Sequence, residues 1–284
     1  MINPVTDTSR NQAMYKLLLL ILLASVPRWA IGQVEPPFHT LMNIAKIKKV
    51  IPVDTVAGRT NVLFTSIADN PDLIFIYAPG GDGHMAISTG ENGLPLSKRP
   101  RNPAYFFAPA FLEKSAAWAA IDVPAMFAST TDVMASRALR TDQKHIDAMT
   151  QVGRKFREEF PKARLILLGH SNGAVAAGMQ AILTKPPFDG IVFSAPQLAP
   201  LPFSWKPEQA NVPIMFITHE NDACKGSEAY QTVRAAGSKF PVTVIKSPSS
   251  GSPSECFMAP GPHFFTDTHV EYADVLLKWA ASLK

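Results

Sequence analysis

Residues 165–173 read LILLGHSNG and residues 174–178 read AVAAG. The apolar run predicts a buried strand, and the small residues after the glycine predict a helix packed close to a sheet. Between the two, Gly169, Ser171 and Gly173 form a Gly-x-Ser-x-Gly sequence, in which the glycines relieve crowding in a sharp strand-to-helix turn. The stretch predicts that Ser171 projects from this turn as a nucleophile, and an ordinary turn is the alternative.

Short apolar runs alternate with helical patterns along the rest of the chain. Runs without alternation of apolar and polar residues are typical of strands that are covered on both faces in a parallel sheet. Residues 144–160 carry apolar side chains at every third or fourth position and predict an amphipathic helix. The alternation predicts one α/β domain, with strands at 62–64, 73–77, 118–122, 165–168, 191–193, 214–217 and 242–245.

The composition excludes several classes of protein. Of the 284 residues, 46% are hydrophobic and 18% are charged, which supports a packed core and excludes intrinsic disorder. The 27 Lys and Arg against 23 Asp and Glu give a net charge of +4, too small and too dispersed for a nucleic-acid-binding protein. The sequence has no metal-ligand cluster, phosphate-binding glycine loop or dinucleotide fingerprint, so we expect neither a cofactor nor a metal.

The first 32 residues have the pattern of a signal peptide. Arg10 and Lys16 precede an apolar run at 17–23 that is too short to span a bilayer as a helix. Ala30 and Gly32 supply the small residues that precede a cleavage site. We therefore predict a signal peptide at 1–32 and a mature domain at 33–284, secreted or periplasmic, with no stable membrane span. A retained N-terminal anchor is the alternative.

The strand, the Gly-x-Ser-x-Gly turn and the helix of small residues resemble the nucleophile segment of the α/β-hydrolase family. The resemblance extends over most of residues 60–284. It implies a mostly parallel central sheet flanked by helices, and a nucleophile that is followed along the chain by an acid and then by a histidine. Because the segment 197–211, where many members insert a cap domain, is short, we expect little or no cap.

The resemblance assigns the acid and the base to two later loops. Asp222, within the sequence HENDAC, stands at the acid position of the family, and Glu220 is the alternative. His263, within the sequence GPHFF, stands in the loop before the last helix, and His269 is the alternative. The carboxylate would hold the imidazole in the tautomer that accepts the proton of the nucleophile.

The sequence APGGDGH at 78–84 is similar to the glycine-rich oxyanion loop of esterases and lipases. A tetrahedral intermediate of acyl transfer needs two N–H donors. The resemblance assigns one of them to Gly81, with Asp82 as the alternative, and the other to the backbone amide of Asn172, directly after the nucleophile.

Two other histidines have simpler interpretations. His170 occupies the variable position of the turn before the nucleophile. His145 is expected on the exposed face of the helix at 144–160. Neither histidine is assigned a role in the reaction.

Cys224 and Cys256 are the two cysteines of the chain. An even number of cysteines in an exported protein predicts a disulfide, and two buried free thiols are the alternative. Closing this loop would stabilise the fold by roughly 3–4 kcal/mol in the chain-entropy model. The bond would also tie together the two loops that carry the acid and the histidine.

Two stretches near the expected site allow more than one interpretation. The segment 83–117 is rich in proline and aromatic residues and forms either a lid or substrate wall, or a packed surface loop. Its basic residues Lys98, Arg99 and Arg101 either attract an acidic substrate or form a solvated turn.

The predicted function is a secreted serine hydrolase that cleaves a small-molecule or polymeric carboxylic ester through an acyl-enzyme on Ser171. A peptidase, an acyltransferase and a polyester depolymerase use the same residues, and the fold does not choose among them. A binding module without catalysis on a hydrolase scaffold is the alternative outside enzymes.

Overall fold

The structure is a computed structural model, and it describes residues 36–197, 206–256 and 259–283. Contacts group Pro36–Lys284 into one unit. The predicted signal peptide at 1–32 lies outside the described residues, so its cleavage stays a prediction. Within the described ranges, no helix is long and apolar enough to cross a membrane.

Eight strands form the central sheet, and a short hairpin forms a second sheet. The eight strands are β1 (Ile47–Thr55), β2 (Gly58–Ser66), β3 (Leu73–Ala78), β6 (Ala117–Ile121), β7 (Arg164–His170), β8 (Gly190–Ser194), β9 (Ile214–His219) and β10 (Val242–Ile245). Their spatial order is β1-β2-β6-β3-β7-β8-β9-β10. The pairs β1–β2 and β2–β6 are antiparallel, and all pairs from β6 to β10 are parallel. The hairpin consists of β4 (Ile87–Thr89) and β5 (Pro95–Ser97).

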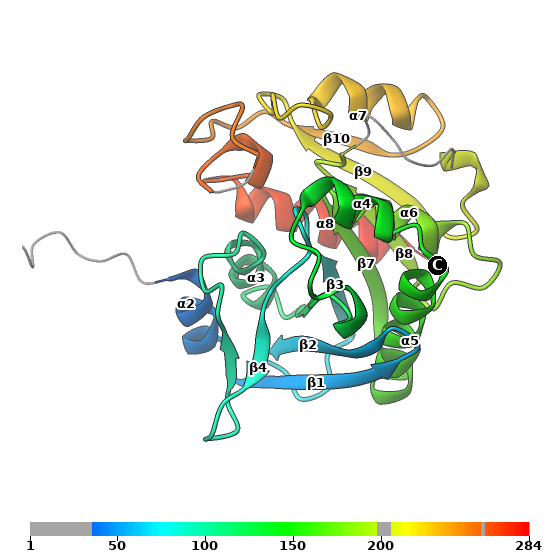
Figure 1. The fold of residues 1–284 in the computed structure, drawn as a ribbon. Helices are drawn as coiled ribbons and strands as arrows, with labels where there is room; N and C mark the ends of the chain where they lie inside the picture. The colour runs from blue at the N-terminus through cyan, green and yellow to red at the C-terminus, as the bar shows by residue number, and fades with distance from the viewer. Residues whose placement is uncertain (1–35, 198–205, 257–258, 284) are drawn as a thin grey trace, which may run out of the picture. The chain divides into compact units, whose positions relative to one another are not determined.

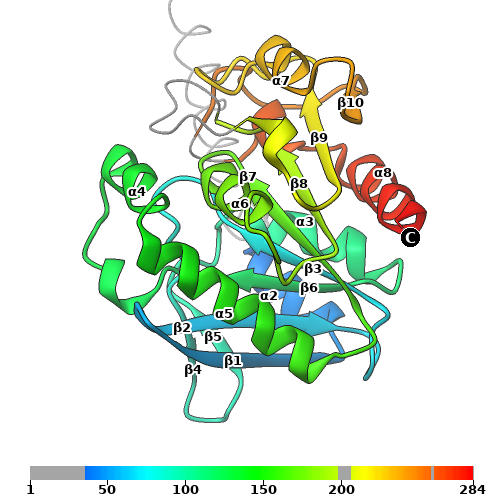
Figure 2. The same ribbon diagram turned by 90° about the vertical axis from the view of Figure 1, so that its right-hand side faces the viewer.

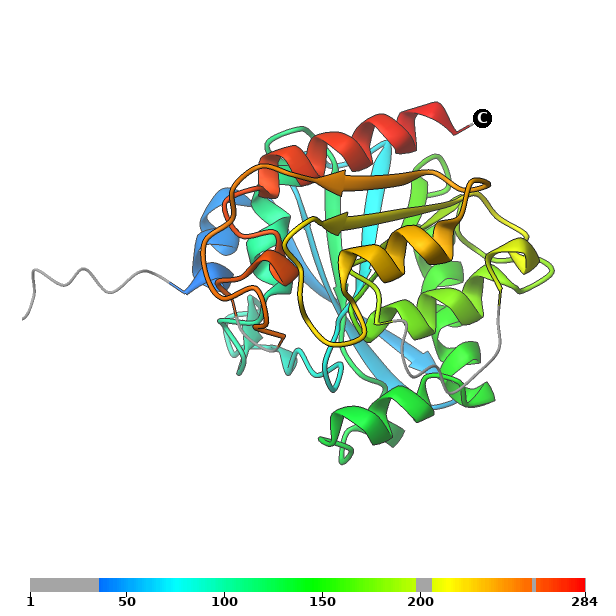
Figure 3. The same ribbon diagram turned by 90° about the horizontal axis from the view of Figure 1, so that it is seen from above.

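Helices cover both faces of the sheet (Figures 1 and 2). One face packs against α2 (Pro37–Ile44), α3 (Ala104–Leu112) and α8 (His269–Ser282), and the other against α5 (Gln143–Glu159), α6 (Gly173–Ala181) and α7 (Ala229–Ala236). Side chains alternate between the two cores along each strand, because successive residues of a strand point to opposite faces. In β3, Phe75 and Tyr77 enter the first core, whereas Ile74 and Ile76 enter the second. Figure 3 shows β9 and β10 between α7 and α8.

The remaining helical segments are short and lie in connections. They are α4 (Val133–Leu139) and the 3₁₀ turns η2 (Ala125–Phe127), η3 (Pro207–Gln209) and η4 (Pro262–Phe264). Two of them contribute to the site: the carbonyl of Val133 in α4 accepts a hydrogen bond from the side chain of Asn172, and η4 contains His263.

The structure confirms the predicted fold class: a mostly parallel sheet flanked by helices, with no cap domain among the described residues. Each predicted apolar run overlaps a strand, and the predicted helix at 144–160 is α5, whose N-cap Asp142 accepts a hydrogen bond from the Lys144 N–H. The strands not predicted from the sequence are β4 and β5 of the short hairpin and β1 of the central sheet. The case of β1 has a physical reason. This strand is an antiparallel edge strand with one exposed face, so it lacks the continuous apolar run that marked the buried strands.

The carboxyl ends of the parallel strands meet at one edge of the sheet, where ligands bind in open α/β folds. The register places Ala78 of β3 beside Gly169 of β7, and His170 of β7 beside Ser194 of β8. The loops that leave β3, β7, β9 and β10 at this edge carry the four groups of predicted site residues.

Candidate active site

Ser171 lies in the sharp turn between β7 and α6 and has a positive φ of 52°. A non-glycine residue with positive φ is strained, and such strain is characteristic of functional sites. Neighbouring strands hold the residue in place: its N–H donates to the Ser194 carbonyl (2.9 Å), and its carbonyl accepts from the Gln197 N–H (3.0 Å). The turn therefore fixes the backbone of Ser171 while its side chain lines two cavities.

Two glycines make room for this turn. A Cβ atom on Gly80 would lie 2.8 Å from the Cβ of Ser171, and one on Gly173 would collide with the carbonyl oxygen of Ala78. The loop after β3 and the start of α6 can approach Ser171 this closely only because neither position carries a side chain.

Asp222 and His263 form the second part of the site. Nδ1 of His263 lies 2.9 Å from Oδ2 of Asp222, and both side chains are completely buried. The other carboxylate oxygen of Asp222 accepts the Cys224 N–H at 3.0 Å. Because the ionised carboxylate only accepts hydrogen bonds, Nδ1 carries the proton and Nε2 carries the free lone pair.

Ser171 is linked to this pair through neighbouring residues, with no hydrogen bond between them among the described residues. Nε2 of His263 is buried and has no hydrogen-bond partner among the described residues. The ring of His170, which precedes the serine, lies 5.1 Å from the ring of His263 between centroids. Phe264, which follows the histidine, lines the same cavity as Ser171. Bonds between nucleophile and base are often long in unliganded enzymes and shorten in the complex with substrate.

His170 is more than a variable residue of the turn. Tyr272 of α8 donates its hydroxyl proton to Ser194 Oγ (2.8 Å), and this oxygen lies 3.1 Å from Nδ1 of His170. Burial, together with the neighbouring His263, holds the pKa of His170 well below its usual value. His170 is therefore a neutral ring that packs beside the ring of His263.

The loop after β3 presents backbone N–H groups beside Ser171. Among the described residues, the N–H of Gly81 and that of Asn172 have no hydrogen-bond acceptor, and the same holds for Asp82, the alternative donor. The Gly81 carbonyl accepts from Nδ2 of Asn172 (2.9 Å) and from Nη2 of Arg140 (3.3 Å). These bonds fix the orientation of the loop.

Arg140 is a buried support of this loop. Burial lowers the pKa of its guanidinium to about 10, and Asp82 partly opposes this shift. Nothing in the sequence around Arg140 marks it, because its contact with Gly81 joins residues 59 positions apart.

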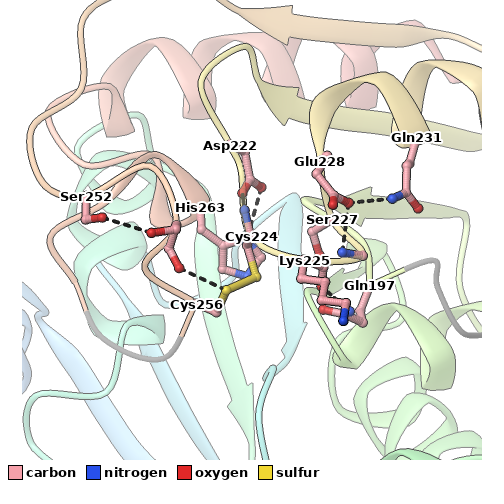
Figure 4. Close-up of a disulfide and its surroundings, with 12 residues drawn as sticks. Gln197, Asp222, Cys224, Lys225, Ser227, Glu228, Gln231, Ser252, Cys256 and His263 are labelled. Carbon is pink, nitrogen blue, oxygen red and sulfur yellow. Dashed lines mark hydrogen bonds and ion pairs between the residues drawn. A yellow bond between two sulfur atoms is a disulfide. The ribbon is translucent and has the colours of Figure 1, made fainter.

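A disulfide joins Cys224 to Cys256, with Cα atoms 5.3 Å apart (Figure 4). Cys224 follows Asp222 by two residues, and its N–H binds that carboxylate. The bond ties the loop after β9 to the loop after β10, which carries His263. Both cysteines also line a cavity beside Ser171.

Two cavities meet at the nucleophile, and Gly81, Val133, Ser171 and Cys256 line both. The first, here called the Arg99 pocket, has a volume of about 200 Å³ and is also lined by Asp82, Arg99, Asn102, Pro103, His170 and Phe264. The second, here called the Lys225 pocket, has a volume of about 240 Å³ and is also lined by Met134, Arg137, Asn172, Gln197, Cys224 and Lys225.

The segment 83–117 supplies part of the wall of the Arg99 pocket and a helix, α3, that packs in the core. Asn102 and Pro103 line the Arg99 pocket, whereas Phe107 and Phe111 of α3 are buried in the core. Arg99 lies at the pocket, where Nη1 donates to both carboxylate oxygens of Asp82 at 2.9 and 3.0 Å.

The alternatives Glu220 and His269 differ from Asp222 and His263 in their surroundings. Glu220 is exposed, and no hydrogen bond joins it to His263 among the described residues. His269 begins α8, and its Nε2 is already bonded to the carbonyl of Phe264 (3.0 Å). The prediction that His145 is exposed was wrong. It is 7% exposed, because its face of α5 packs against η2, where the Phe127 ring lies 5.7 Å away.

Asp222, Cys224 and His263 bring ligand atoms within 4.8 Å of one another, close enough for one metal ion. In this chain the sulfur of Cys224 is bonded to Cys256, and Nδ1 of His263 is bonded to Asp222. The three groups therefore satisfy one another, and their arrangement favours an acid–base pair over a metal site.

No family model matches the sequence, and no curated protein matches it. Solved structures do match. A lidless α/β serine hydrolase from Xanthomonas campestris has a TM-score of 0.52 at 13% identity, over 82% of this chain and 93% of that one. Dienelactone hydrolase from Anabaena variabilis has a TM-score of 0.54 at 12% identity, with 84% and 98% covered. A cold-adapted esterase from an Arctic intertidal metagenomic library has a TM-score of 0.52 at 12% identity, with 84% and 94% covered.

This chain has the α/β-hydrolase fold. In the α/β-hydrolase fold the nucleophile sits on a strained turn after a central strand, and the acid and the histidine follow on later loops. Ser171, Asp222 and His263 stand in that order on the loops after β7, β9 and β10. No sequence pattern predicted the supports of the site, namely Arg140, the side chain of Asn172 and the backbone contacts of Gln197.

Proposed function

We propose that this protein is a serine hydrolase that cleaves carboxylic esters. The observation that carries the proposal is the buried hydrogen bond between His263 and Asp222, beside a serine with positive φ. A carboxylate that fixes Nδ1–H leaves Nε2 as the only basic nitrogen of the ring, which is the requirement for a general base.

In the proposed reaction, Nε2 of His263 removes the proton of Ser171 as Oγ attacks the ester carbonyl. The N–H groups of Gly81 and Asn172, which lack acceptors among the described residues, stabilise the oxyanion. His263 then returns the proton to the leaving alcohol, and an acyl-enzyme remains on Ser171. Water, deprotonated by the same nitrogen, releases the acid and restores the serine.

Ester hydrolysis is proposed in preference to peptide hydrolysis because this chain covers nearly the full length of the similar esterase and dienelactone hydrolase but less than half of a similar peptidase. This chain covers 94% of the Arctic esterase and 98% of the dienelactone hydrolase. It covers 42% of the acylaminoacyl peptidase from Pyrococcus horikoshii, with a TM-score of 0.52 at 8% identity. We also propose that the mature protein is exported after cleavage at residue 32, a setting in which the disulfide is stable.

The test is Ser171→Ala in the purified protein. We expect wild-type protein to hydrolyse p-nitrophenyl butyrate and to be labelled by a fluorophosphonate at one site, identified by peptide mass spectrometry as Ser171. The variant should lose labelling and at least 10³-fold of kcat/KM, since it lacks the nucleophile.

Ser227→Ala is the matched control, because this serine is also buried near the site and its hydroxyl bonds Gln197 instead of facing the nucleophile turn. It should keep labelling and turnover. Folded wild-type protein that is not labelled and does not turn over any ester would overturn the proposal and favour a binding module. Cleavage of acyl-peptides alone would mean that the substrate of this hydrolase is an amide and not an ester.

A further inference from the structure

The two cavities beside Ser171 differ in charge. In the Arg99 pocket, the carboxylate of Asp82 is bonded to the guanidinium of Arg99, so the two charges offset each other. In the Lys225 pocket, the charged residues among the described lining are Arg137 and Lys225, and none of these lining residues is acidic. One side of the nucleophile is therefore close to neutral and the other is cationic.

Arg137 and Lys225 belong to one hydrogen-bond network around Ser171, and Gln197 lies at its centre. The Gln197 N–H donates to the Ser171 carbonyl (3.0 Å), and the Gln197 carbonyl accepts from Nη2 of Arg137 (2.9 Å). Its side-chain amide donates to the carbonyl of Lys225 (2.6 Å), as Figure 4 shows. These bonds fix the guanidinium of Arg137 and the backbone of Lys225 relative to the nucleophile.

Burial strengthens the field of Arg137. Arg137 is 2% exposed, and desolvation lowers the pKa of its guanidinium. A charge removed from water interacts more strongly with an anion than an exposed one does. Lys225 is exposed at the mouth of the same pocket, so it can attract a charged group from solution.

We propose that the Lys225 pocket binds a carboxylate on the substrate, so that the preferred esters carry a free carboxylate on one side of the scissile bond. This inference rests on the proposed function. The neutral part of such an ester would occupy the Arg99 pocket, and the carboxylate would sit between Lys225 and Arg137. Charge-assisted hydrogen bonds of this kind raise kcat/KM about 10-fold over a neutral ester of the same size.

The experiment compares matched ester pairs in wild-type protein. The acyl-side pair is mono-p-nitrophenyl glutarate against p-nitrophenyl valerate, and the alcohol-side pair is 4-carboxyphenyl butyrate against phenyl butyrate. We expect about a 10-fold preference for the anionic member of at least one pair, and a smaller preference in 0.5 M NaCl, since salt screens the exposed Lys225.

Lys225→Glu should abolish this preference, measured within the variant as the ratio of kcat/KM for the two members of each pair. Lys185→Glu is the matched control: it makes the same charge change in the exposed loop between α6 and β8, at the opposite edge of the sheet, and should keep the preference. Glutarate should also slow fluorophosphonate labelling of Ser171 in wild-type protein but not in Lys225→Glu, a readout independent of turnover.

The outcomes separate the inference from the function. Neutral esters turned over with no anionic preference in either pair, or equal preferences in Lys225→Glu and Lys185→Glu, would overturn the carboxylate site and leave the hydrolase intact. No turnover of any ester, together with no labelling of Ser171, would instead overturn the proposed function.

Discussion

The nucleophile turn and the Asp222–His263 pair are held in different ways. The turn is set by residues adjacent in sequence, with glycines at 169 and 173 and a strand and a helix on either side. The pair joins residues 41 positions apart, on loops that follow the last two strands of the sheet. One region is fixed by its own local geometry, and the other depends on contacts between distant segments.

The disulfide joins the two loops that carry the Asp222–His263 pair. Loops are the most mobile and variable parts of a fold, and a proton transfer requires its groups within a fraction of an ångström. The Cys224–Cys256 bond crosses between the two loops of the pair, whereas backbone hydrogen bonds to Ser194 and Gln197 hold Ser171. We therefore expect that loss of the disulfide disturbs the Asp222–His263 pair more than it disturbs the turn at Ser171.

The largest effect is expected from Asp222→Asn. The amide would donate to Nδ1 instead of accepting from it, so the His263 tautomer would reverse and Nε2 would carry the proton. We expect kcat for p-nitrophenyl butyrate to fall about 10⁴-fold, with the free energy of unfolding little changed. Steady-state kinetics and urea denaturation measure the two quantities separately.

Glu220→Gln is the control for that substitution, because Glu220 lies two residues away in the same loop and is exposed. Its kcat should equal that of the wild type. If Glu220→Gln lost activity and Asp222→Asn did not, the acid assignment would move to Glu220, and the buried hydrogen bond would be structural only.

The double substitution Cys224→Ala/Cys256→Ala tests the difference between the two regions directly. Removing a cross-link with a sequence separation of 32 should lower the free energy of unfolding by roughly 3–4 kcal/mol. At a temperature where the variant is fully folded, kcat should fall about 10-fold, because the loop that carries His263 gains freedom. Urea denaturation and kinetics under those conditions provide the measurements.

Labelling of Ser171 distinguishes the turn from the pair in this variant. A labelling rate that falls in parallel with kcat, while the far-ultraviolet circular dichroism stays native, indicates a displaced base beside an intact turn. Wild-type kcat in the folded variant would show that noncovalent contacts alone hold the pair, and the proposed role of the bond would then be wrong.

The same contrast explains how much the sequence could predict. The turn could be predicted because the chemistry, the glycines and the flanking strand and helix all lie within residues 165–178. Asp222 and His263 were assigned from the order of residues in the family that the chain resembles, and the structure joins these two side chains by a hydrogen bond. The disulfide followed from the number of cysteines and the expected compartment.

Residues that act through tertiary contacts could not be predicted. Arg140 and Gln197 reach the site through hydrogen bonds across 59 and 26 positions, and no local pattern distinguishes them from other polar residues. His145 occupies a helix face that looked polar and is covered by η2. Periodicity shows which face of a helix is apolar. It does not show whether a distant segment of the chain packs over the other face.

His145 provides the smallest predicted effect, on the turn side of the comparison. It lines a small cavity together with Gly173 and Ala176 of α6, and desolvation lowers its pKa to about 3 from a usual value near 6.5. Between these values the unfolded chain binds a proton at this ring and the folded chain does not. The free energy of unfolding should therefore fall as the pH falls below about 6.5, by up to about 1.4 kcal/mol per pH unit from this group.

His145→Leu should make this decline between pH 6 and 4 shallower in urea denaturation. The difference between the variant and the wild type at pH 8, where the ring is neutral in both the folded and the unfolded state, measures packing alone. Parallel curves for the two proteins from pH 8 to pH 4 would show that His145 takes up its proton without unfolding, and the wall behind the nucleophile turn would then be open to water.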